Sequence, residues 1–146
     1  MKKTLYKIKK GLDFKLKGEA EESLVVITPS EEYAVMPTDF PGIVPRTMVK
    51  EGDSVLAGQT LFVDKATESI HFVSPVSGTV VGVERGDRRK ILRFRVKASE
   101  KQSFKDFGSQ QLDSLSAEEL KALMLECGIF SFIRQRPYDV IANPED

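Results

Sequence analysis

The sequence has few of the residues on which metal and catalytic sites depend. Its 146 residues include one cysteine, one histidine and no tryptophan. One cysteine cannot form a disulfide within the chain or a thiolate metal site, and one histidine argues against histidine-based catalysis. There is no Ser-His-Asp set and no P-loop, and no apolar run approaches the roughly 18 residues of a membrane-spanning helix. We therefore expect no catalytic residue, no metal site and no transmembrane segment.

Neither sign of charge is in excess. Lys and Arg together number 22, as do Asp and Glu, so the formal net charge is zero. A general nucleic-acid binder needs a basic surplus to displace counterions, so the neutral balance argues against that class. The basic residues of the N-terminus are not followed by an apolar core, and so they do not form a secretory signal. The default expectation is a cytoplasmic globular protein.

Short β segments separated by turn residues occupy the middle of the chain. Strands are predicted at Thr60–Val63, Ser69–Val73, Thr79–Val83 and Lys90–Val96. Glycine and proline between them are typical of an all-β sandwich or barrel. The run Leu24–Ile27 is also predicted as a buried strand, ended by Pro29. The prolines of residues 28–45 favour loops and edge strands over helix.

The pattern changes to a helical period after residue 104. Ser116 followed by Glu119 forms a capping box, and Gly128 suits the position after a helix end. Between them, Leu120, Leu123, Met124 and Cys127 form one apolar stripe. The predicted fold is therefore mainly β over residues 1–100, with a helical extension over residues 101–146 (α+β overall). The extension reads as the start of a second domain that this chain does not complete.

Two segments resemble the halves of a biotinyl/lipoyl-type barrel-sandwich hybrid. These are Val49–Leu61 and Ser74–Val81, each with Gly-punctuated turns. That family can carry a modified lysine between the halves, and Lys65 is the lysine in this interval. It lies ten residues before Pro75, whereas carriers place theirs about eight before, where Thr67 stands here. A lipoyl- or biotin-type carrier using Lys65 is one alternative interpretation.

A wider resemblance covers nearly the whole chain. The matching segments are Ile8–Asp13, Phe62–Lys65, Ser74–Gly78, Arg85–Arg89, Phe104–Phe107, Cys127–Phe130 and Arg134–Tyr138. In this order they resemble the N-terminal portion of the A subunit of the sodium-translocating NADH:quinone reductase, although residues 37–48 depart from the family pattern. A second alternative is the related C subunit of an electron-transport complex that passes electrons to ferredoxin.

The resemblance implies a peripheral place on the cytoplasmic side of the bacterial inner membrane. The complex oxidises NADH, reduces quinone and exports Na⁺, with its flavins and iron–sulfur centre in partner subunits. The A subunit would contribute docking to the other subunits and a quinone-facing surface, without chemistry of its own. In the segment where a related flavin subunit has a glycine-rich loop, only Gly128 is glycine, so no flavin or NADH site is expected here.

Two sets of residues are candidates for binding. Aromatic and cationic side chains that could stack on a quinone ring and donate to its carbonyl oxygens are Phe130, Phe132, Arg134, Arg136 and Tyr138. Basic residues that could dock an acidic partner subunit or anionic lipid headgroups are Lys9, Lys10, Arg88, Arg89, Arg93 and Arg95. Strand alternation is expected to place Leu92, Phe94 and Val96 on one face and the arginines between them on the other.

Overall fold

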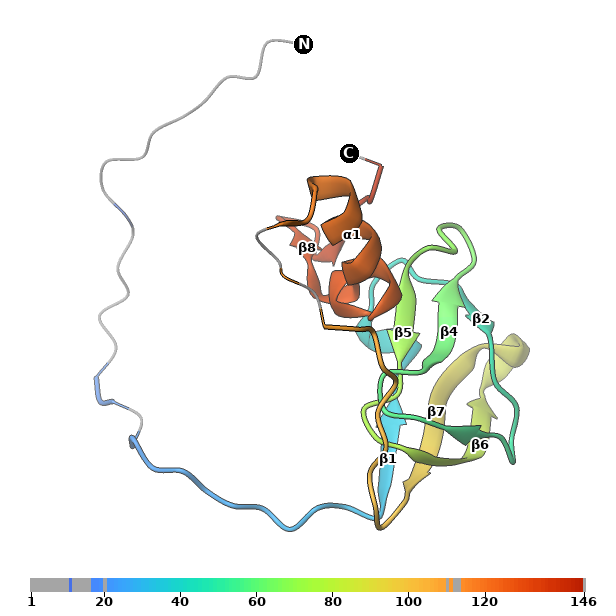
Figure 1. Ribbon diagram of the computed structural model, residues 1–146. Helices are drawn as coiled ribbons and strands as arrows, with labels where there is room; N and C mark the ends of the chain where they lie inside the picture. The colour runs from blue at the N-terminus through green and yellow to red at the C-terminus, as the bar shows by residue number, and fades with distance from the viewer. Residues whose placement is uncertain (1–10, 12–16, 20, 110, 112–113, 146) are drawn as a thin grey trace.

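Two antiparallel sheets form the body of the protein. The computed structural model describes residues 11, 17–19, 21–109, 111 and 114–145. The first sheet has the order β1-β7-β6-β3, with β1 Glu32–Val35, β7 Ile91–Ala98, β6 Gly78–Arg85 and β3 Ser54–Val55. The second has the order β2-β4-β5, with β2 Pro45–Thr47, β4 Thr60–Asp64 and β5 His71–Val73. The four strands predicted between residues 60 and 96 are all present, which confirms a mainly β fold (Figure 1).

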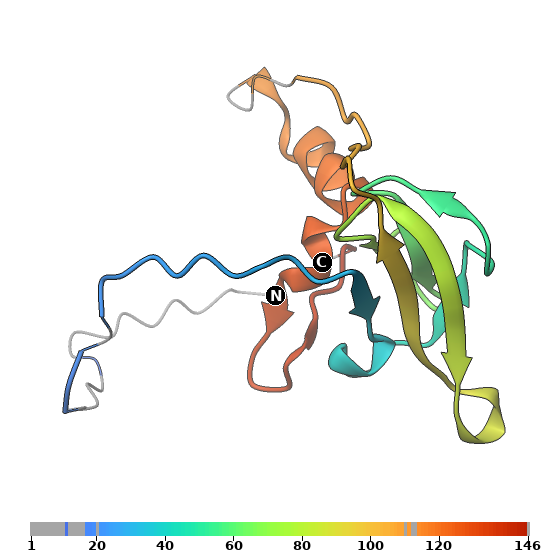
Figure 2. The same cartoon turned by 90° about the horizontal axis from the view of Figure 1, so that it is seen from below.

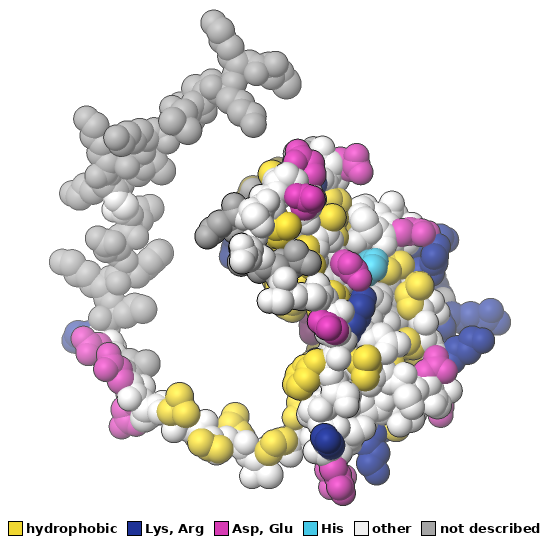
Figure 3. Space-filling view, in the orientation of Figure 1, with side chains coloured by type: hydrophobic (Ala, Val, Ile, Leu, Met, Phe, Trp, Pro, Cys, Tyr) yellow, Lys and Arg dark blue, Asp and Glu magenta, His cyan; other side chains and the backbone are white. Residues whose placement is uncertain are grey.

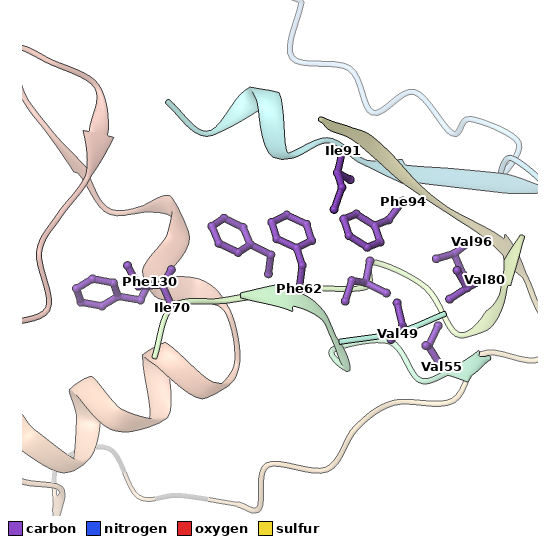
Figure 4. Packing of buried hydrophobic residues seen from close by; sticks show 11 residues of the cluster. Val49, Val55, Phe62, Ile70, Val80, Ile91, Phe94, Val96 and Phe130 are labelled. Carbon is purple, nitrogen blue, oxygen red and sulfur yellow. The ribbon is translucent and has the colours of Figure 1, made fainter. Parts of the chain in front are cut away.

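A stack of three phenylalanine rings joins the two sheets. Phe62 of β4 lies parallel to Phe72 of β5, with ring centres 4.4 Å apart, and to Phe94 of β7, at 4.8 Å. All three side chains are almost fully buried, and Val80 and Val96 complete this layer from the first sheet (Figure 4). Burying one such side chain stabilises a fold by about 1.5–3 kcal/mol, so this stack is a large part of what holds the sheets together.

The β6–β7 hairpin is long and irregular. Its register shifts between Glu84 and Arg85, close to the turn η2 (Asp87–Arg89). As a result Ile91 is buried while Leu92 is 40% exposed. The expectation that Leu92 shares the inner face with Phe94 and Val96 is therefore wrong, because a bulge changes which residues of a strand face inward.

The C-terminal extension packs against one end of the sheets. It contains α1 (Ala117–Glu126), the 3₁₀ helix η4 (Ile129–Phe132) and the small hairpin of β8 (Arg134–Gln135) and β9 (Val140–Ile141). The predicted capping box is confirmed: Ser116 Oγ accepts from the Glu119 N–H, and the Glu119 carboxylate accepts from the Ser116 N–H. The stripe of α1 is half-buried, and Met124 packs on the core.

The predicted strand over Leu24–Ile27 is wrong. These four side chains are 77–94% exposed and belong to no strand. The segment that starts at residue 21 lies apart from the two sheets and leads into β1, where strand structure begins at Glu32 (Figure 1). An apolar β-branched run favours an extended backbone, but burial also needs a neighbouring strand, and β1 holds the place beside β7. In the described part of the chain, no helix is long and apolar enough to cross a membrane.

Candidate functional site

An apolar groove lies where the C-terminal extension meets the sheets. Its volume is about 240 Å³. One wall is the segment 34–40, from β1 into the 3₁₀ turn η1 (Pro37–Asp39). The groove is also lined by Phe72 and Val73 of β5 and, from the C-terminal extension, by Gly128, Ser131 and Phe132. Three parts of the chain that are distant in sequence therefore form one concave, mainly apolar surface.

Aromatic rings lead from the core to the opening of the groove. The Phe40 ring makes an edge contact with Phe72, at 4.6 Å between ring centres, and a looser one with Phe132, at 6.2 Å. Phe72 is 2% exposed, whereas Phe132 is 71% exposed. An exposed aromatic ring beside an apolar groove offers a face on which a planar ligand could stack.

The backbone of the C-terminal extension approaches β5 closely at Gly128, and this contact positions the extension. Gly128 has a φ of +80°, and a Cβ atom there would lie 2.9 Å from Cγ1 of Val73. Beyond it, Ser131 Oγ donates to the Gly128 carbonyl at 2.7 Å. Phe130 is 7% exposed and joins the buried cluster beside Ile70 (Figure 4). The turn is thus held by both a tight contact and an inserted side chain.

Arg134 places a cation beside the groove. Its guanidinium lies 5.0 Å from the centre of the Phe40 ring, and its Nη2 donates to the Asp39 carbonyl at 3.2 Å. Nη1 donates to the Asp139 carbonyl at 3.1 Å. A guanidinium has five N–H donors, so these bonds leave others for a ligand oxygen. The site therefore combines aromatic faces with a positioned hydrogen-bond donor.

The predicted quinone-proximal residues are not all brought together. Phe132 lines the groove and Arg134 lies beside it. Phe130 is buried in the core instead, and Arg136 and Tyr138 lie on the exposed turn between β8 and β9. The structure adds Phe40 and Phe72, which come from other parts of the chain and carry no local signal that distinguishes them from core residues.

Two of the predicted docking residues, Arg93 and Arg95, form ion pairs within the sheet. Glu84 accepts from Arg93 at 2.6 Å and from Arg95 at 3.0 Å, and Arg95 also donates to Glu32 at 2.7 Å. The hydrogen bonds from Arg93, and then from Arg95, lower the pKa of Glu84. Those with Glu32 and Glu84 raise the pKa of Arg95. These two arginines are part of the sheet surface rather than free cations.

The other predicted docking residues are separate from this network. Arg88 and Arg89 lie in the η2 turn and are exposed. Lys9 and Lys10 lie outside the described residues. No described group of three or more His, Cys, Asp or Glu side chains could hold a metal ion.

Lys65 immediately follows β4 and is exposed. Its backbone N–H donates to the Val44 carbonyl at 2.8 Å. The carboxylate of the preceding residue, Asp64, is 5% exposed and accepts from the N–H groups of Val44 and Thr67, each at 3.1 Å. These bonds hold Lys65 at the start of the β4–β5 loop.

Comparison with known proteins agrees with the family resemblance of the sequence. The family model of the NqrA N-terminal barrel-sandwich hybrid domain matches residues 6–99. The A subunit of the Na(+)-translocating NADH-quinone reductase of Marinomonas sp. (strain MWYL1) is 34% identical over 139 residues, covering 94% of this chain and 31% of the relative. Its counterpart from Pseudomonas aeruginosa (strain UCBPP-PA14) is 32% identical over 143 residues, covering 97% and 32%. The chain thus spans about a third of the length of the curated relatives it matches.

Proposed function

The chain belongs to the NqrA N-terminal barrel-sandwich hybrid family, and from this membership we propose that it is a non-catalytic module of a sodium-translocating NADH:quinone reductase. In that complex the module docks the other subunits on the cytoplasmic side of the inner membrane and presents a quinone-facing surface. NADH oxidation and Na⁺ export belong to the assembled complex. Both relatives reported above are named as the A subunit of this reductase, which favours this proposal over a C subunit of the ferredoxin-linked complex.

The groove is the observation that carries the quinone-facing part of the proposal. A quinone headgroup is a planar ring with carbonyl oxygens at its edge. The exposed face of Phe132 suits the ring, and the N–H groups of Arg134 suit a carbonyl oxygen. Small-molecule sites are commonly apolar clefts with a few placed polar groups, and this groove has that composition.

Flavins and the iron–sulfur centre are proposed to belong to partner subunits. A phosphate-binding turn exposes backbone N–H groups to the ligand at a helix start. Here Gly128 packs against Val73, and Phe130 is buried in the hydrophobic core. This packing supports a structural role for the segment that follows α1.

A soluble short-chain quinone, titrated into the 146-residue chain and followed by chemical-shift changes, tests the groove. We expect saturable shifts at Phe40, Phe132 and Arg134. Replacing Phe132→Ala removes the stacking face and should weaken binding about two- to tenfold, the worth of one aromatic contact. Tyr138→Ala is the matched control, because Tyr138 is equally exposed (77%) but lies outside the groove.

Two results would contradict a quinone-facing groove. One is the absence of shifts at millimolar quinone. The other is a set of shifts centred on the β8–β9 turn and abolished by Tyr138→Ala rather than Phe132→Ala. In either case the family membership would stand and the docking role alone would be retained.

A further inference from the structure

We propose that the turn between β6 and β7 is a contact surface for anionic lipid headgroups. Four cationic side chains gather within six consecutive residues there: Arg85, Arg88, Arg89 and Lys90, all of them exposed. Asp87 is the one carboxylate in the same stretch. The chain as a whole is neutral, so this turn concentrates positive charge that is balanced elsewhere.

The turn differs from the rest of the same hairpin in how its charges are satisfied. Further along β7, Arg93 and Arg95 are paired with Glu84 and Glu32. Within the part of the chain that the structure describes, no ion pair or side-chain hydrogen bond holds Arg88, Arg89 or Lys90. Their charge is therefore available to an outside partner.

The backbone holds these residues in an unusual conformation. Arg88 and Arg89 have φ values of 54° and 61°, in the left-handed region that side-chain-bearing residues seldom occupy. Bonds within the turn fix it: Arg85 Nη1 donates to the Arg89 carbonyl, and the Gly86 N–H donates to the Lys90 carbonyl. The cations are thus presented on a defined turn rather than on a loose loop.

The shape of this surface favours a membrane over a discrete anion. Figure 2 shows the η2 turn projecting at the end of the β6–β7 hairpin, away from α1, and Figure 3 shows Lys and Arg side chains gathered along that edge. A projecting tip cannot surround a single phosphate with converging donors, but it can meet a flat layer of headgroups. Leu92 lies against Gly86 and is 40% exposed, which adds an apolar side chain of the kind that enters the headgroup layer.

This inference goes beyond the proposed function and does not depend on the quinone-facing groove. Each basic residue near an anionic membrane surface strengthens binding of the protein to the membrane about fivefold. We therefore expect the 146-residue chain to sediment with vesicles of phosphatidylcholine containing about a third phosphatidylglycerol. It should not sediment with pure phosphatidylcholine, and high salt should release it. Arg88→Gln combined with Arg89→Gln should weaken binding about 25-fold.

The matched control is Lys97→Gln combined with Lys101→Gln. It removes the same charge from exposed positions at or beyond the opposite end of β7. Circular dichroism of each variant confirms that the fold is retained. Equal loss of binding in both double variants would overturn the proposal, because net charge rather than the turn would then be responsible. Binding to soluble polyglutamate that the turn variant loses, without binding to vesicles, would overturn it in favour of an acidic polypeptide partner.

Discussion

Arg134 lies over the ring of Phe40, with its guanidinium 5.0 Å from the ring centre. The two residues come from the C-terminal extension and from the end of the η1 turn, so their contact fastens one to the other. The hydrogen bond from Arg134 to the Asp39 carbonyl reinforces the same junction. The groove is lined by residues of both parts, so the contacts of Arg134 hold together the two segments that form it.

Replacing Arg134→Ala should therefore destabilise the protein by about 1–2 kcal/mol, because a cation–π contact at a partly exposed site is worth about 0.5–1 kcal/mol and a hydrogen bond adds a net amount of similar size. Urea unfolding measures the change. Arg136→Ala is the control, since Arg136 is exposed on the neighbouring turn. Equal effects of the two substitutions would show that the contact with Phe40 contributes nothing.

Gly128→Ala should be among the more damaging single substitutions in the extension. The left-handed backbone costs an alanine about 1 kcal/mol, and the added Cβ would overlap the Val73 side chain, which costs a further 1–3 kcal/mol or so. Gly52→Ala separates the two effects, because Gly52 has a φ of +91° with no atom near the new Cβ. We expect urea unfolding to give a loss of roughly 2–4 kcal/mol for Gly128→Ala and about 1 kcal/mol for Gly52→Ala. Equal losses of unfolding free energy would mean that the Val73 side chain moves aside without a measurable cost.

Glu84 should make the stability of the sheet depend on pH in the acidic range. Hydrogen bonds from Arg93 and Arg95 place its pKa in the folded state below the ordinary value of 4.5. A depressed folded pKa means that Glu84 stabilises the fold above the unfolded pKa. This contribution is lost as the pH falls through the folded pKa.

Urea unfolding from neutral pH down to about pH 3 measures this effect. The Glu84→Gln variant should start less stable at neutral pH and lose less stability on acidification than the unsubstituted chain. Glu51→Gln is the control, because Glu51 is exposed and outside the network. Parallel pH curves for all three proteins would mean that the pairs with Arg93 and Arg95 are too solvent-screened to contribute.

Strands β4, β5, β6 and β7 and the helix α1 could be predicted because their signals are local. The turn residues that separate the strands lie within a few positions of the strands they end. The Ser116–Glu119 capping box likewise lies at the start of the helix that it marks. Strand β1 could not be predicted in this way, because its Glu32 and Tyr33 lack a strong apolar alternation and it is defined by pairing with β7.

The groove could be predicted only in part. Phe132 and Arg134 stand out in the sequence as a mixed aromatic and cationic segment near a helix end. Phe40 lies in a proline-rich stretch that predicts loops, and Phe72 has the pattern of an ordinary inward-facing strand residue. Nothing in the local sequence of either residue indicates that it will meet Phe132, because the meeting depends on how the extension folds back onto β5.

The ion pairs of the predicted docking residues could not be predicted from the local sequence either. Arg93 lies directly opposite Glu84 in the β6–β7 register, and Glu32 reaches Arg95 from β1. The sequence of β7 alone predicts a row of free cations. The neighbouring strands β6 and β1 supply the carboxylates that pair with two of them. Of the predicted docking residues that the structure describes, only Arg88 and Arg89 in the turn keep the free charge that the row predicts.

Lys65 provides a last prediction, which tests the carrier interpretation. Incubation with a lipoyl or biotinyl ligase should leave the intact mass of the chain unchanged, while an established carrier domain in the same reaction gains the expected group. The physical reason is position: carrier lysines stand at an exposed hairpin tip, whereas Lys65 begins the loop and its N–H is bonded to Val44. The buried carboxylate of Asp64 fixes the loop by accepting from the N–H groups of Val44 and Thr67. Lys65 therefore cannot shift into the place held by Thr67 without breaking these bonds and leaving the buried carboxylate without its partners. A mass increase that Lys65→Arg abolishes would contradict this argument and make the chain a carrier.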